Sequence, residues 1–429
     1  MQQSNDDGVV LLIGSGRQAY RQYLIEGLAR RAPVWLIDAE PAGWQSPYLA
    51  GSSVVPMLDA ARAVPDEAGL AAAAERVTRM RGVAGVCTYD EGSVIAAAAV
   101  AERLGLPGLT VAGAERCRDK HLTRKALTAA GLLQPQFALA ATLAETADAA
   151  GRIGFPVVLK PRGMGASAGV VRVTSPGTLA EAYRITTRAG HAGPPDFEAG
   201  LLVEECVEGP EISVDGVVAG GEYRPFCLAR KQLGPPPCFE ETGHVVAATD
   251  PLTRDAGLLA MLTEAHRVLG LADGITHTEI RLTARGPVII EVNGRLGGDL
   301  IPYLGLLATG IDPGQVAADV ARGRPAGLTP AHHQVAGIRF LYPPADCRVT
   351  GMSLPTPADV PGLFSAVPLA ALGSLIYLPP RMHLGRYACL VARTGDPDSC
   401  QAALDQAAAR SSVQAGALTP AELEPEHLL

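Results

Sequence analysis

An apolar segment of this chain stops abruptly at polar residues. Residues 288–299 read VIIEVNGRLGGD, so Glu291, Asn293 and Arg295 follow a run that is typical of a buried strand. The preceding segment, HTEIRLTARGP, contains Glu279, and together the two segments predict a β-hairpin that turns around residues 284–286. In that register Glu279 and Glu291 lie opposite each other, and Asn293 projects from the same face because strand side chains alternate.

These oxygen atoms predict a site for a hard divalent cation. Carboxylates and an amide that gather on an apolar strand pair are costly to leave without a partner. Mg²⁺ prefers oxygen ligands and is commonly held by one or two carboxylates together with substrate phosphates, and Mn²⁺ is the alternative ion. Arg295 then offers a planar guanidinium to a phosphate or a carboxylate. The structural alternative is a salt-bridged loop in which Arg295 neutralises Glu291.

A second group of residues has the chemistry of a phosphate site. The segment LKPRGMGASAG, residues 159–169, places Lys160 at the end of a predicted strand, and the loop that follows contains Gly163, Gly165 and Ser167. A lysine, a hydroxyl and flexible backbone N–H groups make a cradle for a polyphosphate. No GK[ST] sequence follows, so the loop is not a P-loop. An ordinary hairpin loop is the alternative.

Two further segments could meet a nucleotide. In VEECVEGPEIS, residues 203–213, the chain turns after Val207, so backbone groups there could contact a purine edge and Glu211 could accept hydrogen bonds from ribose hydroxyls. The alternative is a pair of solvated surface acids.

Near the N-terminus, Gly14, Gly16 and Ala19 fit the pattern G-x-G-x-x-A between a predicted strand and a predicted helix, and Asp38 ends the next strand. This pattern occurs in dinucleotide sites, but we expect a structural tight turn here.

Composition excludes several classes of protein. The net charge of −8 and the absence of a Lys/Arg run argue against a nucleic-acid partner. The apolar runs are too short to span a membrane, and the first residues do not resemble a signal peptide. The eight cysteines are scattered singly, which argues against zinc and against a disulfide framework. We therefore expect a cytoplasmic protein.

The pattern of elements predicts three domains with a mixed α/β and α+β architecture. Strands alternate with helices in residues 1–112, which predicts a Rossmann-like domain with a parallel sheet. Helices and antiparallel strands follow in residues 113–330, and residues 331–429 form a smaller α+β domain after a Pro- and Gly-containing linker.

Taken in order, these motifs resemble the ATP-grasp superfamily, and in particular its carboxylate–amine ligases that join amino acids. The resemblance runs through roughly residues 110–325. It implies an ATP-grasp fold in residues 113–330 with a lid at roughly residues 135–207, flanked by the two other domains as in biotin carboxylase and the L-amino-acid ligases.

The resemblance also implies a role for each motif. It assigns Lys120, in DKHLTRKAL, and Lys160 to the ATP phosphates, with the loop 163–169 as the flap above them. The adenine is assigned to the hinge from Glu204 to Val207 and the ribose to Glu211; the metal to Glu279, Glu291 and Asn293; and the reacting carboxylate to Arg295. Glu279 stands where many relatives have Asp, so the metal geometry at that position is less certain.

The segment PPPCFEETGHVV is similar to the proline-rich loop of the amino-acid ligases. There an acid and a histidine three residues apart face the substrate, and here these are Glu241 and His244. Glu241 could hold an ammonium group, and His244 could hydrogen-bond a carboxylate or the transferring phosphoryl group. A solvated pair is the alternative.

The implied activity is ATP-dependent amide or peptide bond formation through an acylphosphate, with ADP and phosphate as products. The substrates would be a small carboxylate and a small amine, one of them an amino acid. A biotin-carboxylase-like enzyme, a purine-pathway enzyme and a non-catalytic nucleotide-binding regulator are the alternatives. The architecture is also compatible with a homodimer.

Overall fold

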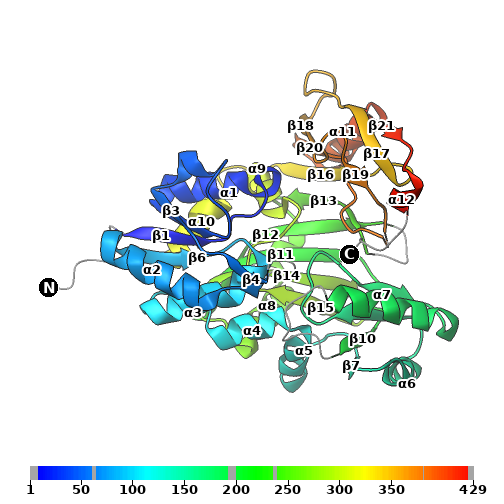
Figure 1. Cartoon of the computed structure of the whole chain (residues 1–429), viewed down its shortest axis with the longest axis horizontal. Coiled ribbons are helices and arrows are strands. Elements are labelled where there is room, and N and C mark those ends of the chain that lie inside the picture. The colour runs from blue at the N-terminus through cyan, green and yellow to red at the C-terminus, as the bar shows by residue number, and fades with distance from the viewer. Residues whose placement is uncertain (1–7, 60–63, 192–199, 235–238, 380, 424–429) are drawn as a thin grey trace.

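Figure 1 shows the computed structural model of the chain, which describes residues 8–59, 64–191, 200–234, 239–379 and 381–423. The first lobe, coloured blue to cyan, contains a parallel four-stranded sheet in the order β3-β2-β1-β6. Its strands are β1 (Val9–Ile13), β2 (Val34–Asp38), β3 (Gly51–Val54) and β6 (Val83–Cys87), and its helices are α1 (Gln18–Arg31), α2 (Glu67–Arg81) and α3 (Val94–Leu104). Two short strands, β4 (Met57–Asp59) and β5 (Val64–Pro65), pair beside it.

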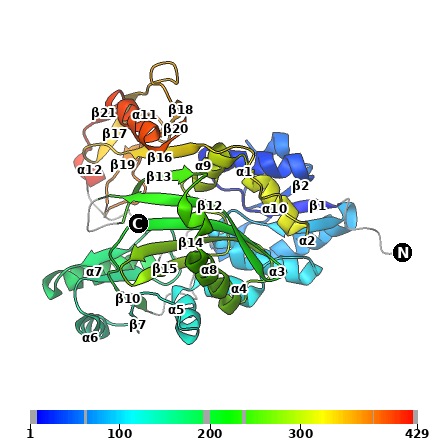
Figure 2. The same cartoon turned by 180° about the vertical axis from the view of Figure 1, so that it is seen from behind.

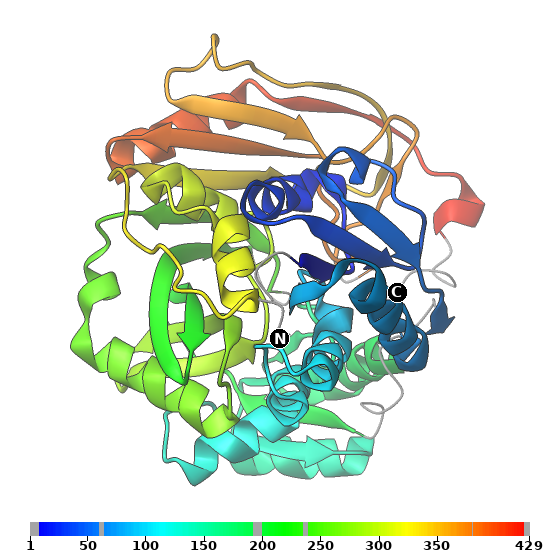
Figure 3. The ribbon, with the colours of Figure 1, turned by 90° about the vertical axis from the view of Figure 1, so that its left-hand side faces the viewer.

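One face of this parallel sheet is covered by a helix from far along the chain. Helix α10 (Pro313–Ala321) packs beside α1, and Ala317, Ala318 and Ala321 share a core with Val10 and Leu12 of β1 (Figure 3). Ion pairs join the same two helices at their edges, from Arg30 to Asp312 at 2.8 Å and from Arg31 to Asp319 at 2.7 Å. The first lobe is therefore fixed to the segment that follows the hairpin.

A smaller antiparallel sheet carries residues 163–169, which we call the glycine loop. Its order is β7-β10-β8-β9, and its strands are β7 (Phe137–Ala140), β8 (Val157–Pro161), β9 (Val171–Val173) and β10 (Leu201–Glu205). Helices α6 (Leu143–Ile153) and α7 (Leu179–His191) pack on it, and α4 (Val111–Arg118) and α5 (Lys120–Ala129) lead into it. The expected lid, residues 135–207, contains this sheet.

The largest sheet has eight antiparallel strands in the order β15-β14-β11-β12-β13-β16-β20-β18. These are β11 (Glu211–Ala219), β12 (Glu222–Leu233), β13 (Glu241–Ala247), β14 (Gly274–Thr283), β15 (Gly286–Asn293), β16 (Val335–Leu341), β18 (Leu363–Pro368) and β20 (Ala388–Thr394). Helix α9 (Ile301–Thr309) packs against the strands in its middle. Because β13 pairs with β16, the sheet continues across the boundary expected at residue 330.

The remaining elements lie at the end of the chain. Strands β17 (Cys347–Ser353), β19 (Leu375–Ile376) and β21 (Ser412–Gly416) form a three-stranded sheet, and helices α11 (Pro397–Ala409) and α12 (Pro420–Leu423) complete this region. Among the helices of the described ranges, none has the length and apolar character needed to cross a membrane.

The predicted hairpin is confirmed. Strands β14 and β15 pair with Thr283 opposite Gly286 and with Glu279 opposite Glu291. A register shift follows Glu279, but it leaves the two carboxylates across from each other. The hairpin therefore brings both acids to one place on the sheet.

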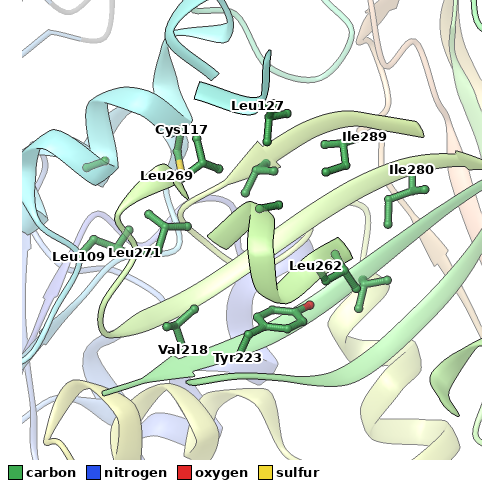
Figure 4. Close-up of a cluster of buried hydrophobic side chains, with 14 of the residues drawn as sticks. Leu109, Cys117, Leu127, Val218, Tyr223, Leu262, Leu269, Leu271, Ile280 and Ile289 are labelled. Carbon is green, nitrogen blue, oxygen red and sulfur yellow. The ribbon is translucent and has the colours of Figure 1, made fainter. Parts of the chain in front are cut away.

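A hydrophobic core between helix α8 (Ala256–Leu269) and the large sheet supports the hairpin. Helix α8 packs on the face of the large sheet that is turned toward the viewer in Figure 2, near β14 and β15. Its residues Leu262 and Leu269 pack with Ile280 and Ile289 of the hairpin, all fully buried (Figure 4). Burying one leucine side chain stabilises a fold by roughly 1.5–3 kcal/mol, so this core holds the strands in register.

We expect Leu262→Ala to lower the free energy of unfolding by about 2–5 kcal/mol, because it leaves a cavity under the hairpin. Urea denaturation followed by circular dichroism measures the change. Leu58→Ala is the control, since Leu58 is 71% exposed and its truncation leaves the core intact. Equal midpoints for the two variants would contradict this account of the core.

Candidate active site

A cavity of about 720 Å³ lies where the first lobe, the glycine loop, the large sheet and the last part of the chain meet. Its wall includes Gly16, Arg21, Ser167, Glu279, Arg295 and Arg386. These residues come from distant parts of the sequence, so only the folded chain forms the cavity. We call it the central cavity.

The glycine loop is bent by left-handed residues and held by cations. Ala166 and Ser167 have φ values of +54° and +56°, and Gly169 has +71°. A side chain on Gly169 would lie 2.4 Å from Ala189 Cβ, so glycine is required there. Below the bend, Arg118 Nη2 donates to the carbonyl of Gly163 at 2.9 Å.

Lys120 joins this loop to the hairpin. Its Nζ donates to the carbonyl of Met164 at 2.6 Å and lies 3.0 Å from Glu291 Oε1. Gly165 follows in the same loop, close to Glu91 of the first lobe. The predicted phosphate residues and the predicted metal ligand Glu291 are thus neighbours.

Lys160 is buried at the end of β8 and forms an ion pair with Glu204 of β10, with Nζ 2.7 Å from Oε2. Arg124 Nε binds the other oxygen of Glu204 at 2.8 Å. Burial lowers the pKa of Lys160, and Glu204 and Glu291 act against that shift. Burial alone would raise the pKa of Glu204, but Arg124 and Lys160 bring it below its usual value.

The side chain of Glu204 is therefore occupied by its ion pairs with Arg124 and Lys160. The sequence assigned residues 204–207 to adenine through backbone groups, and Val207 lies half-buried in the segment between β10 and β11. Lys120 contacts Glu291, and the charge of Glu291 also acts to raise the pKa of Lys160.

The predicted metal ligands occupy the end of the hairpin. Glu279 and Glu291 are opposite each other, and Asn293 is two residues further along β15. Asn293 Oδ1 is buried and has no hydrogen-bond partner within the described ranges, which is unfavourable for an amide oxygen. Two carboxylates and an unpartnered amide oxygen are a donor set that fits a hard cation.

Arg295 forms an ion pair with Glu91 and none with Glu291 among the described residues, although Glu291 contributes to raising the pKa of Arg295. This geometry argues against the salt-bridged loop weighed from the sequence. Arg295 Nε pairs with Glu91 of the first lobe, and its Nη1 donates to the carbonyl of Leu296 at 2.6 Å. Arg118 binds the second oxygen of Glu91. These two arginines lower the pKa of Glu91 to about 2 although burial alone would raise it.

A second cluster surrounds Lys231 of β12, whose side chain is 1% exposed. Its Nζ lies 2.8 Å from both Glu211 and Glu279 and also pairs with Glu241. Glu211, predicted to meet ribose, uses its other oxygen to bind Arg281 at 2.7 Å. Burial alone would lower the pKa of Lys231, but the three carboxylates raise it, so this cation stays charged.

Glu241 and His244 lie on strand β13, not in the loop expected from the sequence. The prolines of that loop fall in residues 235–238, outside the described residues. Side chains three apart on a regular strand face opposite ways, but a register shift at the start of β13 brings His244 Nε2 within 3.1 Å of Glu241 Oε2. Both His244 ring nitrogens lack a hydrogen bond of good geometry to any described residue.

Asp299 and Arg386 complete this side of the cavity. Two nitrogens of Arg386 bind the two oxygens of Asp299 at 2.8 and 2.7 Å, and Asp299 Oδ2 lies 3.8 Å from His244 Nε2. Burial alone would raise the pKa of Asp299, but Arg386 and His244 lower it well below its usual range. Asp299 is therefore a carboxylate with a fixed orientation.

Sequence reasoning missed several of these residues. Glu91, Asp299 and Arg386 lie far from one another in the sequence, and no motif links them. The segment VIIEVNGRLGGD, residues 288–299, ends in Asp299. The position of this acid just beyond the hairpin could have drawn attention to it. Lys231 gave only a weak signal because its three partners come from three different strands.

The G-x-G-x-x-A turn has a structural explanation. Asp38 Oδ2 accepts hydrogen bonds from the backbone N–H of Ser15 at 3.1 Å and from its hydroxyl at 2.7 Å. Gly14 and Gly16 both have φ of +69°. Asp38 thus fixes the turn, as we expected in preference to a dinucleotide site.

The chain was compared with known proteins. Residues 153–302 match the family described as the ATP-grasp domain. Alanine–anticapsin ligase of Bacillus subtilis (strain 168) is 31% identical over 265 residues, which cover 57% of this chain and 55% of that protein. D-Alanine–D-alanine ligase of Acidovorax ebreus (strain TPSY) is 27% identical over 215 residues, or 47% of this chain and 62% of that protein. The chain spans little more than half the length of these curated relatives.

Two solved structures share the architecture. An L-amino acid ligase from Bacillus licheniformis has a TM-score of 0.79 at 23% identity, covering 96% of this chain and all of that one. A biotin carboxylase from Campylobacter jejuni has a TM-score of 0.67 at 14% identity, covering 95% and 92%. The chain therefore has the ATP-grasp fold and carries an ATP-grasp domain, which confirms the predicted resemblance to the amino-acid ligases of that superfamily.

Proposed function

We propose that this protein is an ATP-dependent carboxylate–amine ligase that forms an amide or peptide bond through an acylphosphate, with amino acids as substrates. The observation that carries the proposal is the position of Lys120, whose Nζ joins the glycine loop to Glu291 at 3.0 Å, two residues before Asn293, whose amide oxygen has no partner among the described residues. Cations and metal-type ligands are needed together wherever a γ-phosphate is transferred.

The ATP phosphates lie, in this proposal, under the loop that contains Gly163, Gly165 and Ser167. The two lysines offset the phosphate charge, and they are already held close to that loop. Residues 204–207 meet adenine through the backbone. Glu211 can accept hydrogen bonds from ribose in addition to its contacts with Lys231 and Arg281, because each carboxylate oxygen has two lone pairs.

Glu279, Glu291 and Asn293 would hold Mg²⁺, with Mn²⁺ as the alternative ion. The bound ion would supply charge stabilisation to the phosphates during transfer. In the protein alone, Lys231 and Lys120 contact the two carboxylates. The three residues meet the preference of such ions for oxygen ligands.

The reaction then proceeds in two steps. Arg295 orients a substrate carboxylate, one oxygen of which attacks the γ-phosphorus of ATP while the bond to the ADP oxygen breaks. An amine attacks the resulting acyl carbon: a C–N bond forms, the C–O bond to phosphate breaks, phosphate leaves with the electron pair, and the amine releases a proton. The glycine loop and the last part of the chain exclude water, which would otherwise hydrolyse the acylphosphate.

Glu241 and His244 serve the amino-acid substrate. Glu241 would bind an ammonium group, and His244, with ring nitrogens free of well-aligned hydrogen bonds among described residues, would contact a carboxylate or the transferring phosphoryl group. The three-domain division, at residues 112 and 330, belongs to the same proposal: the cavity lies where the three regions meet.

Incubation with ATP, Mg²⁺ and mixed amino acids, followed by mass spectrometry, tests the function. We expect an amide product together with ADP and phosphate in equal amounts. ATP binding without substrate-stimulated ADP formation would support a regulator instead. Turnover that depends on bicarbonate would support a carboxylase.

We expect Glu291→Gln to reduce turnover by about 100-fold or more, because the divalent ion would lose a charged ligand and be held less well at the phosphates. Phosphate release measures turnover, and a melting curve checks the fold. Glu222→Gln is the control, since Glu222 is an exposed acid on β12 outside the cavity. Near-native turnover of Glu291→Gln would remove Glu291 from the site.

For Glu241→Gln, the KM for an amino-acid substrate should rise by about 10- to 100-fold, because a charged hydrogen bond to ammonium is lost. The KM for ATP should change far less. Steady-state kinetics with each substrate varied in turn separates the two effects. A rise confined to the KM for ATP would show that this residue does not contact the amino acid.

A further inference from the structure

Arg21 is a residue of α1 that the proposed reaction does not use. It is the last residue of the sequence GSGRQAYR, residues 14–21, and it lines the central cavity. A Cβ on Gly16 would lie 3.0 Å from Arg21 Cγ, and Gly16 has a φ of +69°. The glycine therefore leaves room for the arginine side chain, so the turn helps to deliver this cation to the cavity.

Among the described residues, no carboxylate forms an ion pair with Arg21. Its Nη1 donates to the carbonyl of Gly297 at 3.2 Å, and no acid of the described residues lies within 4.0 Å of it. By contrast, Arg295 pairs with Glu91 and Arg386 pairs with Asp299. Burial lowers the pKa of Arg21 and Arg295 lowers it further, while Tyr23, Asp90 and Asp299 act against that shift without forming an ion pair with Arg21. A partly desolvated guanidinium without a counter-ion favours binding of an anion.

The opposite charge is concentrated on another part of the wall. Glu241 and Asp299 lie on either side of His244, at 3.1 and 3.8 Å from its Nε2. The cavity thus offers on α1 a cation that forms no ion pair with any described residue. It also offers two carboxylates, on the large sheet and after β15, which are paired with Lys231 and Arg386 but keep lone pairs that can accept from an ammonium group. A zwitterion with separate carboxylate and ammonium groups has the matching chemistry.

We propose that Arg21 binds the α-carboxylate of the amino acid whose amine attacks the acylphosphate. This inference depends on the proposed ligase function, in which Arg295 already holds the carboxylate that reacts. An anion on Arg21 therefore belongs to the second substrate and is not consumed. The amine substrate is then an α-amino acid, not ammonia or a simple amine, and the product keeps a free carboxylate.

The test compares an amino acid with its α-carboxamide as the amine substrate. The wild-type protein should prefer the acid by about 10- to 100-fold in kcat/KM, the range of a charge-assisted hydrogen bond. Arg21→Gln should abolish this preference, and Arg21→Lys, which keeps the charge but not the planar fork, should restore part of it. Arg79→Gln removes an exposed charge from α2 and should keep the full preference.

A second measurement does not require turnover. Calorimetry with a non-hydrolysable ATP analogue compares binding of the acid and the carboxamide to each variant, and melting curves check the fold. Retention of the preference in Arg21→Gln, or its absence in the wild-type protein, would overturn the inference. Absence of any amide product from the wild-type protein would instead contradict the ligase function. The two failures are therefore distinguishable.

Discussion

The central constraint in this molecule is the placement of Glu279 and Glu291 opposite each other in the β14–β15 hairpin. Two carboxylates placed opposite each other repel, and burial strengthens the effect. Lys231 and Lys120 offset it from different elements, one on β12 and one on α5. The folded chain therefore brings its cations to the same position at which phosphates and a divalent ion would be bound.

Buried ion pairs also connect the lobes. Glu91 of the first lobe binds Arg295 after the hairpin and Arg118 beside the glycine loop. Arg386, from the last part of the chain, binds Asp299. Each of these pairs is largely shielded from water, so removing one partner leaves a charge that is expensive to bury. The geometry of the candidate site and the packing of the lobes consequently depend on the same contacts.

Much of the candidate site could be predicted because its motifs are local. The spacing of Glu279, Glu291 and Asn293 fixes their positions once the hairpin is recognised, since side chains alternate along strands. The glycine loop and Lys160 are likewise contiguous in sequence. The expectation of a loop at Glu241 and His244 was wrong because proline-rich sequence before β13 obscured where the strand begins.

By itself, the sequence determined the hairpin register and the types of residue available for phosphate and metal binding, because periodicity and short motifs express local backbone preferences. The ATP-grasp architecture followed from the resemblance of the ordered motifs to that superfamily. Tertiary structure alone decided which charges pair. Lys231 meets three acids from three strands, Glu91 reaches two distant arginines, and Arg21 faces the central cavity without a carboxylate partner among the described residues. Such contacts depend on the packing of distant elements, for which sequence spacing carries no signal.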